Sequence, residues 1–193
     1  MNSSGTKRLS LFLLASSVIF LFSGMSVVRD PMTVRIEKDG AFIDNIDISK
    51  DWKVATIQRA IGKPDSVEGD AHPDAMYDNY DLGIRYWQRE AKEMGPYVEE
   101  IKFFITAEDR SDPEAHAAFN GLVAFDGIAI DSTFTPERLR RELKGWRNCR
   151  TYGNTMIEFM SDTNYVYVGF DASGRELQWI CVGKVTSIIS SCD

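Results

Sequence analysis

The chain contains few side chains that could carry out nucleophilic or acid–base catalysis. Its two histidines, His72 and His116, lie in segments rich in turn-forming residues. A hydrolytic triad requires a nucleophile, a base and an orienting carboxylate that converge in space. The sequence has no Gly-x-Ser-x-Gly elbow, and none of its three cysteines lies in a recognisable nucleophile turn. We therefore expect both histidines to be solvated loop residues, and we expect the protein not to be an enzyme.

Carboxylates are the plentiful reactive groups, and they concentrate between Asp65 and Asp81. This stretch has six acidic residues and no lysine or arginine. The residue order of an EF-hand is absent, so we expect neither a metal nor a cofactor. Two interpretations stay open: a solvated acidic loop, or a loop that docks into a cationic cleft of another protein, where opposite charges speed association. The candidate partner-binding residues are the six acids and two neighbouring tyrosines: Asp65, Glu68, Asp70, Asp74, Asp78, Tyr80, Asp81 and Tyr86.

The composition argues against two other classes of ligand. The formal net charge is −7 and the isoelectric point is near 4.9, whereas a protein that follows nucleic-acid phosphates needs a basic face. Three cysteines and two histidines are too few for a zinc cluster of standard spacing. Hydrophobic residues make up 44% of the chain, which is enough for a packed core. We therefore expect a folded acidic protein whose partner is another protein, with a basic surface as the electrostatic match.

Residues 1–30 are typical of a targeting segment. Lys7 and Arg8 precede an uncharged apolar run over residues 9–28, which is the pattern of a secretory signal peptide or of an N-terminal membrane anchor. Gly24 and Ser26 suit cleavage by a signal peptidase, whereas the length of the run suits a retained anchor. In both cases the positive charges before the run place the rest of the chain outside the cytoplasm. We expect a periplasmic or other extracytoplasmic protein, either released or anchored in the inner membrane by residues 9–28.

Export also bears on the cysteines, because an exported protein meets an oxidising compartment. The three are Cys149, Cys181 and Cys192. We expect one disulfide between two of them and one unpaired thiol, and the spacing does not choose among the three pairings.

The chain after residue 30 contains an internal repeat. At an offset of 82 residues, Asp44-Asn45 corresponds to Asp126-Gly127, and each turn signal is followed by apolar residues that correspond in pairs. The pairs are Ile46 with Ile128, Ile48 with Ile130, Trp52 with Phe134, Ile57 with Leu139, and Ile61 with Leu143. Thr135-Pro136-Glu137 predicts a capped helix start in the second copy, and Gly62 predicts a helix end in the first.

Segments rich in tyrosine, phenylalanine, valine and isoleucine predict strands after each helix. They span residues 76–80, 83–88 and 97–106 in the first copy, and 155–160, 165–170 and 177–184 in the second. The predicted fold class is α+β, with two tandem ββαβββ-like units whose antiparallel sheets each carry a short helix on one face. The expected organisation is a first repeat over 31–107, a linker over 108–118 and a second repeat over 119–193. Some strand aromatics must then lie on the sheet face away from the helices.

Several of these motifs together resemble an uncharacterised bacterial family of domains of unknown function. They are the helix end Ile61-Gly62-Lys63-Pro64-Asp65, the segment from Tyr77 to Tyr86, Gly121-Leu122, and the helix from Phe134 to Leu143. Some members are associated with toxin–immunity loci, so the resemblance implies a role in toxin neutralisation. The tandem layout is also similar to that of the β-lactamase inhibitor protein, a likeness of fold alone. Neither resemblance supplies catalytic residues.

The sequence therefore favours an exported, non-catalytic protein-binding module. Its most concrete form is an immunity or inhibitor protein that neutralises a secreted toxin through its acidic loop and strand aromatics. One alternative is an assembly or scaffold component of the cell envelope, which a retained membrane anchor would favour. Another is a hydrolase whose site the sequence does not reveal, which would show itself as a polar pocket with a perturbed carboxylate.

Overall fold

The structure is a computed structural model of the chain, and it describes residues 31–69, 74–91, 95–108, 111, 114–153 and 155–185. The targeting segment, Asp70, His72 and Cys192 lie outside these residues. Within the described residues, no helix has the length and apolar character needed to cross a membrane.

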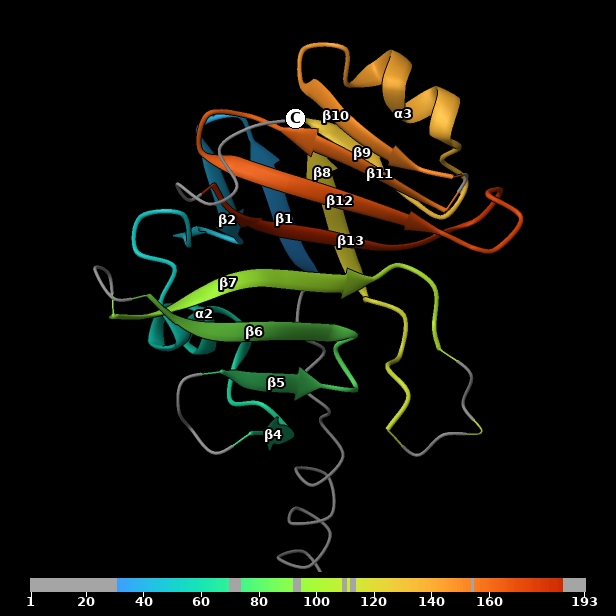
Figure 1. Cartoon of the computed structure of the whole chain (residues 1–193). Helices are drawn as coiled ribbons and strands as arrows, with labels where there is room; N and C mark the ends of the chain where they lie inside the picture. The colour runs from blue at the N-terminus through green and yellow to red at the C-terminus, as the bar shows by residue number, and fades with distance from the viewer. Residues whose placement is uncertain are drawn as a thin grey trace, which may run out of the picture. The chain divides into compact units, whose positions relative to one another are not determined.

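The secondary-structure elements follow the order strands, helix, strands twice along the chain (Figure 1). The first half contains β1 (Met32–Glu37), β2 (Gly40–Ile43), β3 (Ile46–Asp47), α2 (Val54–Ile61), β4 (Ser66–Glu68), β5 (Ala75–Asn79), β6 (Ile84–Ala91) and β7 (Gly95–Phe104). The second half contains β8 (Gly121–Phe125), β9 (Ile128–Ile130), α3 (Pro136–Glu142), β10 (Arg147–Tyr152), β11 (Met156–Met160), β12 (Asn164–Phe170) and β13 (Leu177–Lys184).

The strands form two sheets, and both halves of the chain contribute to each. The large sheet has eight strands in the order β10-β11-β12-β13-β7-β6-β5-β4, and the small sheet has five in the order β3-β2-β1-β8-β9. The halves meet where β7 pairs with β13 and where β1 pairs with β8. The expectation of one antiparallel sheet per unit was therefore wrong, and the β1–β8 pair is parallel. Pairing across the halves removes four strand edges that would otherwise be open to other chains. The coarser prediction of a mixed fold with short helices is confirmed.

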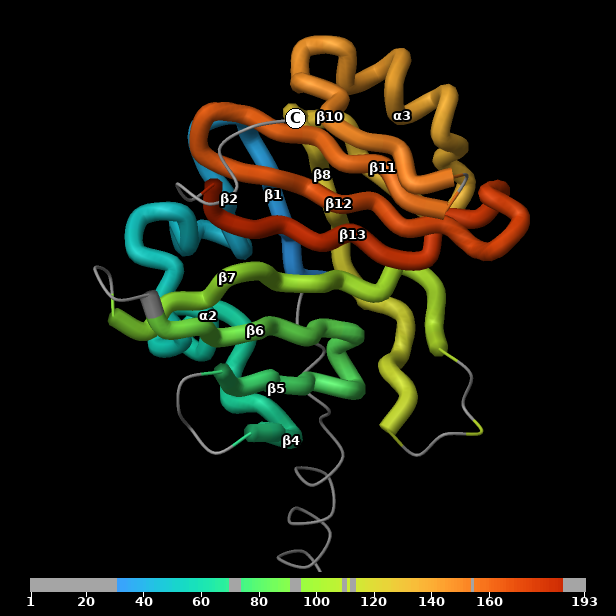
Figure 2. The backbone as a smooth tube through the Cα atoms, viewed as in Figure 1, coloured from blue at the N-terminus to red at the C-terminus, as the bar shows by residue number. Residues whose placement is uncertain are grey.

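The small sheet and α2 lie behind the large sheet in the view of Figures 1 and 2. The core fills the space between them, because alternate residues of the large sheet point toward the small sheet. Cross-strand rows show this alternation: Tyr86, Ile101, Val182, Val166 and Phe159 are neighbours in register on five adjacent strands, and all are buried. The helices and the residues that flank them add Trp52, Ile57, Ile61, Phe134, Leu139 and Leu143 to the same core.

The local signals at turns and helix ends are confirmed at most positions. Asp126 and Gly127 form the turn between β8 and β9, both with positive φ. Thr135 caps α3, because its hydroxyl oxygen accepts the Arg138 N–H at 3.2 Å. Gly62 ends α2 with a φ of 98°, a backbone conformation that favours glycine.

The strand boundaries agree with the sequence patterns to within a few residues, and β13 agrees at both ends. Two strands that follow the helices, β4 and β10, were missed. The first is three residues long, and the second has mostly exposed side chains at the edge of the large sheet. Neither has the apolar alternation that marks a half-buried strand.

The two helix starts offer a matched test of capping. Thr135→Ala should lower the free energy of unfolding by about 1 kcal/mol, because it removes a side-chain bond to the first turn of α3. Lys53 occupies the same position before α2 but makes no capping bond with its side chain, so Lys53→Ala should change stability by less than about 0.5 kcal/mol. Urea denaturation of both variants measures the difference. Equal losses would show that the Thr135 bond does not stabilise the protein.

Candidate functional site

One face of the large sheet carries no described helix or strand, and we call it the outer face (Figures 1 and 2). Residues directly opposite one another in an antiparallel sheet project from the same face. The register therefore identifies a central row across seven strands: Asp78, Arg85, Lys102, Cys181, Tyr167, Glu158 and Arg150. Five of these seven side chains are charged, whereas the corresponding row of the inner face belongs to the hydrophobic core.

Aromatic rings lie flat on the outer face where the neighbouring strand has glycine. Gly169 is opposite Trp179, and a Cβ at Gly169 would come within 2.1 Å of the indole ring. Gly183 is opposite Tyr165, and a Cβ there would come within 2.2 Å of the phenol ring. The glycines therefore let both rings cover the backbone, and of the two rings Trp179 is partly exposed whereas Tyr165 is buried.

A depression of about 370 Å³ lies on the outer face where the two halves meet. Its walls include Trp87, Tyr152, Tyr167 and Trp179, from four different strands, and two charged side chains, Lys102 and Glu100, also line it. Tyr152 is 42% exposed, and it is one of three large hydrophobic side chains that are well exposed in the described part of the chain. The recess thus combines aromatic walls with one cation and one carboxylate.

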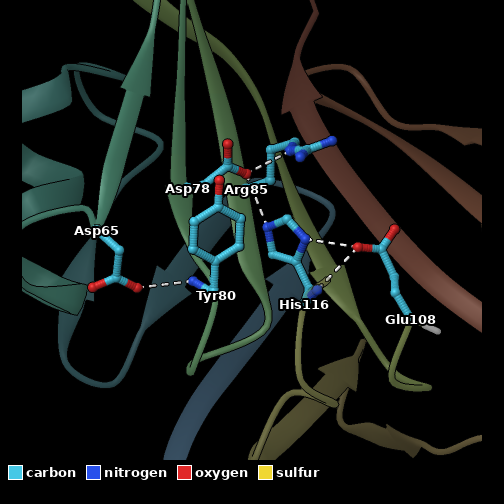
Figure 3. Close-up of polar contacts among 6 residues, drawn as sticks. All are labelled: Asp65, Asp78, Tyr80, Arg85, Glu108 and His116. Atoms are coloured by element: carbon cyan, nitrogen blue, oxygen red, sulfur yellow. Dashed lines mark hydrogen bonds and ion pairs between the residues drawn. The ribbon is translucent and has the colours of Figure 1, made fainter. Parts of the chain in front are cut away.

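At the β5 end of the central row lies a network of charged side chains around His116 (Figure 3). The imidazole is fully buried; its Nδ1 lies 2.8 Å from Glu108 Oε2, and its Nε2 lies 2.9 Å from Asp78 Oδ1. Arg85 Nε donates to the same Asp78 oxygen. Ionised carboxylates only accept hydrogen bonds, so both bonds to His116 form together when both ring nitrogens carry a proton. The network then alternates two anions with two cations.

The network holds the connection between β7 and β8 against the large sheet. The backbone N–H of His116 donates to Glu108, and Ala117 N–H donates to the Tyr80 carbonyl. The imidazole stacks on Phe104, with 4.1 Å between ring centroids. Gly83, with a φ of 63°, lets this connection pass, since a Cβ there would lie 2.3 Å from the Ala117 oxygen.

The expectation that His116 is a solvated loop residue was therefore wrong, because its side chain is buried. The sequence showed it in a polar connection, but the residues after it are Ala117, Ala118 and Phe119, and this short apolar run was the available signal of burial. His72 lies outside the described residues. Partial burial raises the pKa of Glu108, but hydrogen bonds from the backbone and ring of His116, together with the charge of the ring, outweigh it, and the pKa is lowered from its ordinary value of 4.5.

The acidic stretch includes two paired strands, because β4 pairs with β5 at the edge of the large sheet. Asp65, Glu68, Asp74 and Asp81 are exposed, and Asp70 lies outside the described residues. Asp65 Oδ2 accepts the backbone N–H of Tyr80, which is half-buried beside His116 (Figure 3). Two predicted partner-binding residues need correction: Asp78 and Tyr86 are fully buried, one in the His116 network and the other in the core.

The two described cysteines differ in state. Cys149 is disulfide-bonded, whereas Cys181 has a free thiol buried in the central row of the outer face. Burial is the main cause that raises the pKa of the Cys181 thiol, so this thiol is a poor nucleophile.

The fold and the outer face together define a mostly β protein that presents a partly aromatic sheet face beside a buried ionic network. The chain belongs to the DUF7738 family, a domain of unknown function whose family model matches residues 33–140. The matched region includes the small sheet except Met32 and the whole His116 network, whereas Tyr167 and Trp179 lie beyond it. The comparison with curated proteins found no match.

Two solved structures are similar to parts of this chain, each with a TM-score of 0.42. One is an extracellular protein containing an SCP domain from Bacillus anthracis str. Ames, with 9% identity over 72% of this chain and 45% of that chain. This chain thus spans less than half of that protein. The other is a DUF4309 family protein from Bacillus subtilis subsp. subtilis str. 168, with 18% identity over 77% of this chain and 89% of that chain.

The His116 network predicts a loss of stability in acid. Glu108→Gln should lower the free energy of unfolding at neutral pH by about 1 kcal/mol, a modest value because the side chain is partly exposed. A carboxyl whose pKa is lowered by folding stabilises the protein above its unfolded-state pKa, and this is lost as the pH falls through the folded-state value. The difference between wild type and Glu108→Gln should therefore shrink between about pH 5 and about pH 3.

Urea denaturation at several pH values measures this difference. Glu142→Gln is the matched control, since Glu142 forms an exposed ion pair with Arg141 and should contribute little at any pH. A Glu108→Gln difference that stays constant in acid would contradict the role assigned to this carboxylate.

Proposed function

We propose that this protein is a non-catalytic binding protein that docks another protein on the outer face of the large sheet, and that it acts as an exported immunity or inhibitor protein for a secreted toxin. The observation that carries the proposal is the aromatic depression between the two halves, where Tyr152, Tyr167 and Trp179 surround a recess on a face that no described element covers.

The construction of this face suits protein recognition. Tyrosine and tryptophan dominate interface hot spots, because they bury large areas with few rotatable bonds. Here they stand on paired antiparallel strands, and Trp179 is held over Gly169. A surface that is already ordered loses less entropy on binding than a loop would.

The His116 network supports a structural role rather than acid–base catalysis. A general base must reach the proton that it takes from a substrate. Both ring nitrogens of His116 already face carboxylates, and neither His116 nor Asp78 has exposed side-chain surface. The network therefore acts as a clamp on the chain connection beside the outer face.

The inhibitor proposal further rests on the sequence. The targeting pattern of residues 1–30 would bring the protein to the compartment that a periplasm-acting toxin enters. The exposed acids Asp65, Glu68, Asp74 and Asp81 lie at or beside the β4–β5 edge of the large sheet and would attract a basic toxin surface. The second candidate is an envelope scaffold component that uses the same face, favoured by the membrane-spanning length of the apolar run over residues 9–28.

We also propose that the two halves descend from one ββαβββ-like unit. The five apolar pairs found at an offset of 82 residues each share a burial class, partly buried for Ile46 with Ile128 and buried for the other four. The strand order of the large sheet supports the same proposal, since it runs outward from the central β7–β13 pair in reverse chain order on both sides.

Site-specific photo-crosslinking in the source cell tests the docking face. A photoreactive phenylalanine analogue in place of Tyr152 should crosslink one stoichiometric partner. The matched control is Leu122, which is 45% exposed but lies on β8 of the small sheet. A purified partner whose enzymatic activity falls when the full chain is added would support the inhibitor proposal.

Several envelope proteins crosslinked at position 152 would support the scaffold instead. Identical products at both positions, or none at position 152, would contradict docking on the outer face.

Once that partner is known, the salt dependence of binding tests the steering role of the exposed acids. Association should slow by roughly tenfold between low and physiological ionic strength, while dissociation changes little. Glu68→Lys with Asp74→Lys should reduce this salt dependence. The control is Asp39→Lys with Asp162→Lys, which changes the net charge equally at exposed residues away from β4 and β5. Association that is indifferent to salt would rule out steering.

A further inference from the structure

Lys102 holds an unusual position at the centre of the outer face. Its ammonium nitrogen lies 4.6 Å from the ring centroid of Phe104 and 4.6 Å from that of Trp179. The side chain also lines the depression. Burial is the largest of the effects on its pKa, which is lowered from the ordinary value of 10.5. The rings therefore attract the cation, but they do not replace the water it has lost.

None of the ion pairs in the described part of the chain includes Lys102. The carboxylates near it have other partners. Glu108 accepts from His116, and Glu100 accepts from the hydroxyl of Tyr165 at 3.3 Å. The next cation in the row, Arg85, is bonded to Asp78.

We propose that the depression is a receptor for a carboxylate, and that the docked partner inserts an aspartate or glutamate side chain onto Lys102. The inference rests on the proposed function, because it names the anchor residue of that same protein partner. It specifies one group at the centre of the interface, whereas the basic surface proposed for the toxin concerns the β4–β5 edge.

The chemistry of the recess favours an anion over the other groups that a protein partner could present. A lysine or arginine would meet the ammonium of Lys102, and Glu100, the one carboxylate in the lining, already accepts from the hydroxyl of Tyr165. An apolar group would cover the ammonium without pairing it, which is costly for a desolvated charge. A carboxylate instead pairs the ammonium in a recess from which aromatic walls exclude water, and exclusion of water strengthens such a bond.

The residues around Lys102 also define what should flank the acid on the partner. Trp179, Tyr167, Met156 and Tyr152 lie on one side of the recess, on the strands of the second half. We therefore expect apolar or aromatic residues next to the acidic one. The anchor is then an acidic side chain within an apolar segment.

A library of random short peptides, panned on the immobilised full chain, tests the inference. Peptides that bind the wild type but not Trp179→Ala are ligands of the outer face. These should share an aspartate or glutamate flanked by apolar residues. In a synthetic peptide from this set, replacement of the acid by its amide should weaken binding by about tenfold or more.

Lys102→Met, which keeps the length of the side chain and removes its charge, should weaken binding of the acidic peptide by a similar factor. Combined with the amide peptide, it should cost no more than either change alone, because both changes remove the same ion pair. Lys63→Met is the control, since Lys63 is exposed after α2. The amide peptide on the wild type keeps the test valid should Lys102→Met fold poorly.

The outcomes separate the two proposals. Outer-face peptides without an acidic position, or penalties that add in the double change, would overturn the carboxylate inference and leave docking on the outer face intact. A library with no peptide that depends on Trp179 would count against the proposed function itself.

Discussion

The pairing of β7 with β13 is the interaction on which the rest of the structure depends. It joins the two halves into one large sheet and places Lys102 opposite Cys181 and Phe104 opposite Trp179. The depression on the outer face lies across this junction, so neither half contains it alone. The parallel β1–β8 pair makes the same connection in the small sheet, and the shared core fills the space between. The depression is thus a product of how the halves associate, which explains why no single sequence motif marks it.

The His116 network fixes the chain connection from β7 to β8 against the large sheet. Buried ion pairs carry a large desolvation cost and stabilise a fold only when their remaining hydrogen bonds are satisfied. Here His116 pairs with two carboxylates and Arg85 pairs with one of them, while Asp78 Oδ2 is buried with no hydrogen-bond partner among the described residues. The network therefore fixes the position of the β7–β8 connection more than it adds to the free energy of unfolding. Hydrogen bonds between charged groups are directional and so define one geometry, whereas an apolar contact is non-directional and would allow the connection to shift.

Local signals made much of the fold predictable. The Asp-Gly turn, the Thr135 cap, Gly62 and the apolar periodicity each depend on a few adjacent residues, and the structure bears out each of them. The arrangement of the sheets was not predictable, because the partner of an edge strand is chosen by contacts between residues far apart in the chain. The His116 network was not predictable for the same reason, because its members are far apart in the chain. Asp78 and His116 are 38 residues apart, and the sequence shows each only as a polar residue near a turn. Tyr86 was misplaced because alternation does not state which face of a strand is buried.

The clamp and the depression share Phe104, and this contact links the two parts of the outer face. His116 stacks on the ring at 4.1 Å, and the ammonium of Lys102 lies 4.6 Å from the same ring. The ring is 2% exposed, so it has little room to move independently of either neighbour. Glu108 also acts on both, through its bonds to His116 and through its charge on Lys102. Since the clamp fixes Phe104 from one side, the position of Lys102 at the centre of the face depends on buried groups, His116 and Asp78, that have no exposed side-chain surface. These buried groups therefore contribute to the geometry of the proposed docking face without being part of its surface.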